Sequence, residues 1–368
     1  MYVGGFILEK IKKQRNTNVE YLRLLAAFMI VVNHYALHGE FAYASALSIN
    51  SLLIQFLHSC GKIGVCIFLF ISGYYSSTSK KYQFRHIAKF VLEVAFYSVV
   101  FAAVGFGLHT MTLSEIGKMV FSIPFNEWQY VTSYFMVICL SFWTNKLIYA
   151  LTEKQFLGLL LFLLVTWSLI PTFFKGDFAL SNFTFYMMIY LIAGYLRRIE
   201  YRIKLSGKTL IYIGLGAYGL ILLSVLAIDV VGELYLHFIL HFAEHFRNLP
   251  SIFVIVTSGA LTLGVIRLKP SHNKFVQTIA STTLGIFIIH ENRAIRPFLW
   301  TEILCTKDFT DSGFLFLHAL LTCAALTAVC IVIDLIRQQT VGRLEEKLFG
   351  RWIDSTEEKI NTFLDVSK

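Results

Sequence analysis

The stretch Glu20-Tyr-Leu-Arg23-Leu-Leu-Ala-Ala-Phe-Met-Ile-Val-Val-Asn33-His34 is typical of a membrane-spanning helix, but it carries polar residues where a lipid-facing helix has none. Arg23 and His34 are eleven residues apart, about three helical turns, so their side chains point to the same side, roughly 16 Å apart along the axis. Glu20 lies one turn before Arg23 on that face. Ionisable groups at membrane depth usually mark a pathway or a reaction site. The alternative is that Glu20 and Arg23 reach the water at the membrane interface and that His34 is a packed polar residue.

The composition is that of a helical membrane protein. Of 368 residues, 56% are hydrophobic and only 15% are charged, and the mean hydropathy is +0.65. Soluble proteins carry about 25% charged residues. The apolar residues come in blocks of about twenty, the length that crosses a bilayer, and the strand alternation of a membrane barrel is absent. The sequence therefore predicts an all-α, polytopic integral membrane protein. Its net charge of +9 fits the positive-inside rule, so no nucleic-acid partner is expected.

The apolar blocks predict a bundle of about ten transmembrane helices. They cover residues 21–37, 54–76, 87–108, 129–149, 156–173, 183–196, 209–229, 251–266, 276–291 and 314–336. With the N-terminus in the cytoplasm, 24 of the 32 lysines and arginines fall on the inner side and 6 on the outer side. This bias predicts that both termini are cytoplasmic, with Arg23 near the inner end of its span and His34 near the outer end.

The chain divides into three predicted parts. Residues 1–18 form a basic cytoplasmic or interfacial N-terminus, residues 19–337 form the transmembrane domain, and residues 338–368 form a polar cytoplasmic tail. In the tail, apolar residues recur at helical spacing from Val341 to Trp352, which predicts a short amphipathic helix on the inner membrane surface. Partner binding is the alternative for this helix.

A second histidine is predicted at the depth of His34. The ninth predicted span runs from inside to outside and ends at His290, so two separate spans bring a histidine near the outer face. Two such residues at one level favour a site over a structural role. Glu291, Arg293 and Arg296 follow directly, either to bind an anionic or sugar acceptor or simply in contact with water.

Two further clusters have ordinary explanations beside functional ones. The basic cluster Lys80, Lys81, Arg85 and Lys89 after the second span is either positive-inside charge or a site for the phosphates of a cytosolic cofactor.

In an outer loop, three histidines lie four residues apart, as zinc ligands on one helix face do. Lining of an acceptor cleft is the preferred function for them, and no metal is predicted. They are His237, His241 and His245.

Several stretches together resemble the membrane-bound acyltransferase family 3, the integral-membrane O-acyltransferases that modify bacterial polysaccharides and related glycans. The family's first-helix signature is Arg or Lys, ten residues, then His, and Arg23 and His34 match it. The second-helix pattern Gly-Val-x-x-Phe-Phe-x-x-Ser-Gly is matched from Gly64 to Gly73, with Leu69 in place of the second Phe.

The resemblance extends over most of the chain, from about Asn18 to Arg337. The stretch 281–290 is similar to a late family helix that ends Ser-x-x-x-Tyr-x-x-His, with Phe287 where Tyr is common. The segment containing Trp128 and Tyr130 also resembles the family. The resemblance implies an O-acyltransferase of the bacterial cytoplasmic membrane that takes an acyl group from cytosolic acyl-CoA, with acetyl-CoA as the expected donor. The expected acceptor is a hydroxyl of a cell-surface or exported polysaccharide, or of its lipid-linked precursor.

The resemblance also assigns roles to residues. His34 is expected to act as general base or transient acyl carrier, and Arg23, held by Glu20, to stabilise the polar groups of the donor or developing charge. His290 is expected to orient the acceptor or assist proton transfer. Many members carry an Arg-x-Arg after the second helix, but here the expected contacts to the CoA phosphates are Lys80, Lys81, Arg85 and Lys89. The residues expected to bind the acceptor are Asn33, Trp128, Tyr130, Glu291 and Arg293.

A different class of function also fits ten spans with polar residues inside them. A transporter or flippase for a lipid-linked saccharide would have the same composition. Such proteins often carry an inverted repeat between their halves, and the sequence shows none. Acyl transfer is therefore the preferred prediction, while the oligomeric state is left open.

Overall fold

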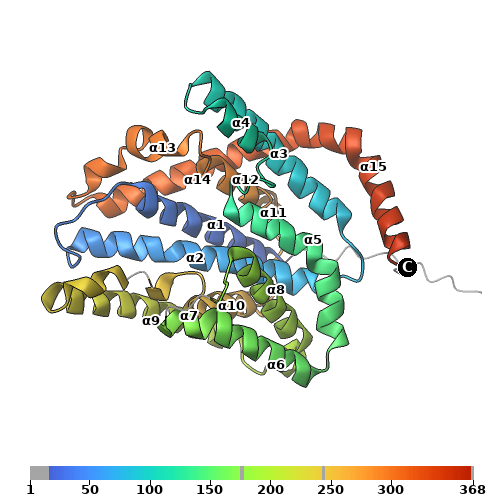
Figure 1. Ribbon diagram of the computed structural model, residues 1–368, viewed down its shortest axis with the longest axis horizontal. Coiled ribbons are helices and arrows are strands. Elements are labelled where there is room, and N and C mark those ends of the chain that lie inside the picture. The colour runs from blue at the N-terminus through green and yellow to red at the C-terminus, as the bar shows by residue number, and fades with distance from the viewer. Residues whose placement is uncertain (1–15, 175–177, 243–244, 366–368) are drawn as a thin grey trace, which may run out of the picture.

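The computed structural model describes residues 16–174, 178–242 and 245–365 (Figure 1). These residues form an all-helical bundle, and none of them lies in a β-strand. The basic residues of the predicted N-terminal part, up to and including Arg15, lie outside the described ranges. The long helices are α1 (Thr17–His38), α2 (Ile49–Ser76), α3 (Phe84–Gly107), α5 (Gln129–Ala150), α8 (Asn182–Arg198), α9 (Gly207–Leu234), α10 (Ile252–Ile266), α14 (Leu315–Gln339) and α15 (Val341–Phe363). The shorter ones are α4 (Leu113–Val120), α6 (Glu153–Leu164), α7 (Ile170–Phe174), α11 (Lys274–Ala280), α12 (Thr283–His290) and α13 (Arg296–Phe298).

Helices α1 and α2 pack along each other in the middle of the bundle (Figure 1). Small residues allow this close approach, as is common between membrane helices. A Cβ atom on Gly64 would lie 2.6 Å from the backbone oxygen of Ala26, and one on Gly61 would lie 2.4 Å from the side chain of Asn33. Gly73 gives α8 the same access to α2, since a Cβ there would meet the Cβ of Ala193 at 2.8 Å. Gly61 and Gly64 therefore set the position of α1, and Gly73 sets that of α8.

Seven helical segments of the described chain are long and apolar enough to cross a membrane. They correspond to seven of the ten predicted spans. The other three predicted spans are helical but do not meet these criteria: the polar residues of α1 lower its mean hydropathy, α8 has 17 residues, and the span 276–291 is interrupted. Ten spans and the inside–outside orientation stay predictions.

The prediction of one continuous helix over residues 276–291 was wrong. The structure has α11 and α12 with a turn at Ser281 and Thr282 between them. The cause lies in three consecutive hydroxyl residues, since Ser281, Thr282 and Thr283 each donate a side-chain hydrogen bond to a backbone carbonyl three residues earlier. Such bonds compete with regular helix hydrogen bonding.

The segments predicted on the inner side gather at one end of the bundle, on the right in Figure 1. The start of α1 bonds to the loop before α11, with Thr17 N donating to Ser271 O at 2.8 Å. The loop before α3 bonds to α15, with Tyr82 N donating to Asn361 Oδ1 at 2.8 Å. Near the opposite end, Asn50 Nδ2 donates to Thr310 O at 2.8 Å. The loops therefore sort to two ends as the charge pattern predicts.

Candidate functional site

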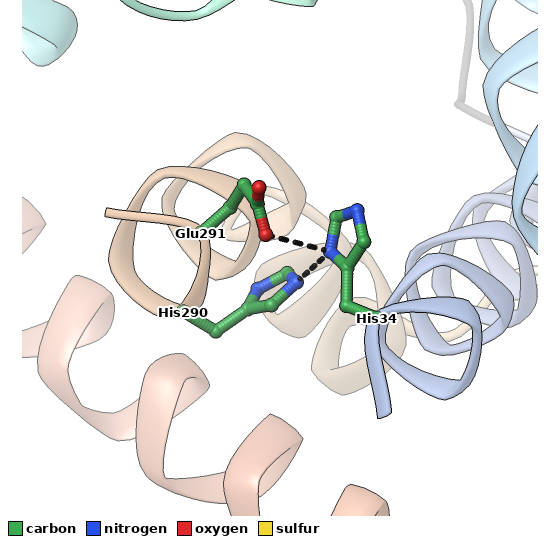
Figure 2. Close-up of side chains that lie close together, drawn as sticks. All are labelled: His34, His290 and Glu291. Atoms are coloured by element: carbon green, nitrogen blue, oxygen red, sulfur yellow. Dashed lines mark hydrogen bonds and ion pairs between the residues drawn. The ribbon is translucent and has the colours of Figure 1, made fainter. Parts of the chain in front are cut away.

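The ends of α1 and α12 bring His34 and His290 into direct contact, as Figure 2 shows. His34 Nδ1 lies 2.8 Å from His290 Nε2. His290 is fully buried, and the side chain of His34 is 12% exposed. Two histidines predicted at one depth from separate parts of the sequence are thus hydrogen-bonded neighbours.

The hydrogen bonds fix the tautomer of each neutral ring. His290 Nδ1 lies 2.5 Å from the backbone oxygen of Ile286, which can only accept, so the His290 proton is on Nδ1 and its Nε2 is an acceptor. His34 Nδ1 therefore carries the His34 proton and donates it to His290. The lone pair of neutral His34 is left on Nε2, which points away from both His290 and Glu291 (Figure 2). This is the arrangement of an oriented general base.

Glu291 contacts His34 of this histidine pair. The sequence had predicted that Glu291 binds the acceptor instead. Glu291 Oε2 lies 3.3 Å from His34 Nδ1 and 3.1 Å from His38 Nε2, and its Oε1 accepts from Arg296 at 2.7 Å. A carboxylate beside the protonated nitrogen of an imidazole orients the ring and stabilises the imidazolium. His38 was not among the predicted site residues, and Arg296 was expected to bind the acceptor or contact water, not to pair with Glu291. His38 stands one helical turn after His34, a spacing that was available as a signal.

The donor set of His34, His290 and Glu291 also resembles that of a zinc site, because the three ligand atoms lie within 4.8 Å of one another. Ligand atoms around a tetrahedral Zn²⁺ with bonds of 2.0–2.1 Å lie roughly 3.3 Å apart. His34 Nδ1 and His290 Nε2 lie 2.8 Å apart, which is a hydrogen-bond distance. The geometry favours a hydrogen-bonded pair over two ligands of one ion, so a metal-free site stays the prediction.

Aromatic rings connect this site with Arg23 along one side of α1. Phe287 lies 6.2 Å from the His34 ring and 5.1 Å from Tyr130, which stacks on Tyr134 at 6.0 Å. Arg23 is within electrostatic reach of both tyrosines. Ser72 of the second-helix motif hydrogen-bonds the Tyr134 hydroxyl at 2.9 Å. Tyr130 is therefore part of the wall between the two ends of the first-helix signature.

Arg23 keeps its predicted partner at the inner end. Arg23 NH1 lies 3.4 Å from Glu20 Oε2, and the side chains of Arg23 and Glu20 are 33% and 7% exposed. The buried carboxylate holds a guanidinium that still reaches solvent, so Arg23 is available to an anionic group.

The other residues predicted to bind the acceptor have partners of their own or lie buried. Arg293 pairs with Glu115 and Glu127 from the segment between α3 and α5. Trp128 is buried at the start of α5. Asn33 is buried against Gly61, and its Oδ1 has no hydrogen-bond partner within the described ranges. The structure thus groups His34, His290 and Glu291, and it does not group Arg293 or Trp128 with them.

The basic cluster is partly covered by α15. Arg85 pairs with Glu346 and Asp354, and Lys89 Nζ lies 3.1 Å from Glu346 Oε2. Glu357 Oε2 also accepts from the backbone N–H of Arg85 at 2.6 Å. The tail therefore forms a 23-residue helix whose acidic face docks on α3, which amphipathicity alone did not predict. Lys80 and Lys81 are exposed.

The outer histidine loop does not form the expected α-helical face. His237 begins a 3₁₀-helix that ends at Phe242, and His245 begins another that ends at Arg247. Residues 243–244 and the His241 side chain lie outside the description. Among the described residues, the side chains that are grouped as metal ligands would be are His34, His290 and Glu291, called the His34 cluster below.

Comparison with protein families agrees with this arrangement. The chain matches the family model Acyl_transf_3, an acyltransferase domain, over residues 16–335. That range holds the first-helix signature, the second-helix motif and the histidine pair. No curated protein and no solved structure matches the chain at a significant level. The family match spans most of the sequence, and the chain therefore belongs to the acyltransferase 3 family of membrane acyltransferases.

Proposed function

We propose that the protein is an O-acyltransferase that moves an acyl group, with acetyl as the first candidate, from cytosolic acyl-CoA to a hydroxyl of a polysaccharide or its lipid-linked precursor. The observation that carries this proposal is the oriented His34 imidazole, whose Nε2 points away from His290 and Glu291. The family match favours a transferase over the transporter that the composition also allowed. The bacterial cytoplasmic membrane is the proposed location.

The proposed reaction uses His34 as general base. His34 Nε2 removes the proton of the acceptor hydroxyl while the hydroxyl oxygen bonds to the acyl carbon. The bond between that carbon and the thioester sulfur breaks, and the proton passes to the sulfur, which yields an ester and a free thiol. Glu291 stabilises the imidazolium formed in between, and His290 holds the ring orientation. Transient acylation of His34 is the second route to the same products.

The inner end of the site is proposed to bind the donor. Arg23 lies one third exposed beside Glu20, where it would stabilise negative charge on the donor. Exposed Lys80 and Lys81 would contact phosphate groups, and Arg85 and Lys89 would do so only where α15 leaves them accessible.

The test is replacement of His34 by Gln or Ala in protein reconstituted into lipid bilayers. Transfer of radiolabelled acetyl from acetyl-CoA to extracted envelope glycan should fall at least about 10²-fold, since a positioned base contributes that much or more. Replacement of His272, an exposed histidine in the loop before α11, should leave transfer unchanged. Retained transfer in the His34 variants at normal protein level would rule out this assignment.

A further inference from the structure

A hollow of about 530 Å³ opens where α5 and α8 begin, beside the segment that leads into α10. All three elements begin on the predicted outer side of the membrane. The volume lies within the ~300–1,000 Å³ typical of small-molecule sites. It is separate from the His34 cluster, since none of the residues of that cluster lines it.

The lining of the hollow is polar without being charged. Its polar members are all amides or hydroxyls: Asn126, Gln129, Thr132, Ser133, Ser181 and Asn182. Amides and hydroxyls both donate and accept hydrogen bonds. The absence of any lysine, arginine, aspartate or glutamate from the lining residues favours an uncharged ligand with many hydroxyl groups.

Two observations show hydrogen-bonding capacity directed at this space. Ser133 is only 8% exposed and lines the hollow, and its hydroxyl has no hydrogen bond to any described residue. Asn182 Nδ2 donates to Gln129 Oε1 at 3.1 Å, which leaves the Gln129 amide N–H groups and Asn182 Oδ1 for a ligand. The Ser133 hydroxyl is therefore open to the hollow, where a ligand or water can hydrogen-bond it.

The remaining lining is apolar, with Phe183, Leu180 and Pro250 among its members. Aromatic and aliphatic side chains bind the C–H faces of a sugar ring while polar groups bind its hydroxyls. One turn of α5 also connects the hollow to the reaction site. Gln129 and Ser133 face the hollow, whereas Tyr130 contacts Phe287 beside His34.

We propose that this hollow binds an uncharged saccharide segment of the acceptor and holds the glycan while its reacting hydroxyl is at His34. This inference rests on the proposed function. The chemistry of the lining identifies the ligand class as a neutral oligosaccharide. A lipid acyl chain would leave the Ser133 hydroxyl, the Gln129 amide N–H groups and Asn182 Oδ1 without ligand hydrogen bonds.

The test measures binding without catalysis. Full-length protein in lipid nanodiscs is titrated calorimetrically with neutral trisaccharides built on glucose, galactose or N-acetylglucosamine, and with a uronic-acid trisaccharide. At least one neutral probe should bind. Q129A and N182A should each raise its Kd roughly tenfold, the value of about one hydrogen bond. S133L, which fills the hollow, should abolish binding.

Two controls make the result specific. S114A, on the exposed outer helix α4, should leave the Kd unchanged. H34Q should lose acyl transfer but keep probe binding, so failure of the proposed reaction and failure of this site are told apart. The inference is overturned if no neutral probe binds, if only the uronic-acid probe binds, if S133L leaves binding intact, or if lipid alone is retained at the hollow.

Discussion

At the scale of single residues, Glu291 determines how His34 works. Its carboxylate contacts His34, His38 and Arg296 at once, and it is 13% exposed. A carboxylate in that position stabilises positive charge on the imidazole during proton transfer. E291Q keeps the shape and removes the charge. We expect the kcat for acyl transfer to fall at least about tenfold with little change in the KM for acyl-CoA.

A nearby acidic residue offers the matched control. Glu302 is exposed in the π-helical turn Leu299–Ile303 that follows α13, so E302Q should leave kcat unchanged. Steady-state kinetics on both variants, at equal amounts of folded protein, checks the prediction. An unchanged kcat in E291Q would show that the carboxylate is a structural partner of Arg296.

The residues of the site were only partly predictable from the sequence. His34 and His290 were predicted because span direction determines which residue reaches which membrane face. The role of Glu291 was not predicted, since its side chain turns back toward α1 only after α12 ends. Arg296 was expected only to bind the acceptor or contact water. Its pairing with Glu291 depends on the position of the short helix α13, which no sequence periodicity indicates.

At the scale of elements, the contact between α1 and α2 depends on Gly64. A Cβ there would lie 2.6 Å from a backbone oxygen of Ala26, and a backbone cannot rotate away as a side chain can. Overpacking of this kind costs about 1–3 kcal/mol. G64A should therefore lower the thermal unfolding temperature of the purified protein. G216A on α9 is the control, because a Cβ there meets nothing within 4 Å.

The docking of α15 on α3 should depend on pH. The pKa of the Glu346 carboxyl is lowered below its ordinary 4.5, because Lys89 and Arg85 donate hydrogen bonds to the ionised form. A lowered folded-state pKa stabilises docking fully above pH 4.5, and this contribution is lost as the pH falls through the lowered value. Hydrogen exchange in residues 341–363 should accelerate well below pH 4.5. E346Q should remove that pH dependence, whereas E358Q, at an exposed position, should retain it.

The same contact gives a prediction about the donor. If Arg85 and Lys89 bind phosphates as proposed, the carboxylates of α15 compete for them. The double change E346Q and D354N should then lower the KM for acyl-CoA severalfold at low salt, and the effect should fade as salt screens the charges. An unchanged or raised KM would show that α15 supports the donor site or is unrelated to it. The amphipathic spacing of residues in α15 predicted an apolar face for this helix, but it did not predict that the acidic face packs on α3.

At the scale of the whole molecule, the distribution of the loops was well predicted and the continuity of the spans was not. Hydropathy and charge sort segments between two ends, and the hydrogen bonds of Thr17 with Ser271 and of Tyr82 with Asn361 join segments predicted on one side. Helix breaks depend on local side-chain bonding, as at Ser281, which a sliding window of hydropathy averages out. Hydropathy also underrates α1 as a span. Its polar residues, which include those of the site, reduce the mean hydropathy of this helix.

The number of crossings can be tested through the two termini. Ten crossings place both termini on the same side, whereas seven place them on opposite sides. We expect a fluorescent protein fused after Lys368 to fold and fluoresce in the cytoplasm, and alkaline phosphatase fused there to be inactive. Phosphatase fused after Asn126, in the predicted outer segment before α5, should be active. An active phosphatase at Lys368 together with cytoplasmic labelling of the N-terminus would establish an odd number of crossings, and it would remove the argument that places His34 near the outer face.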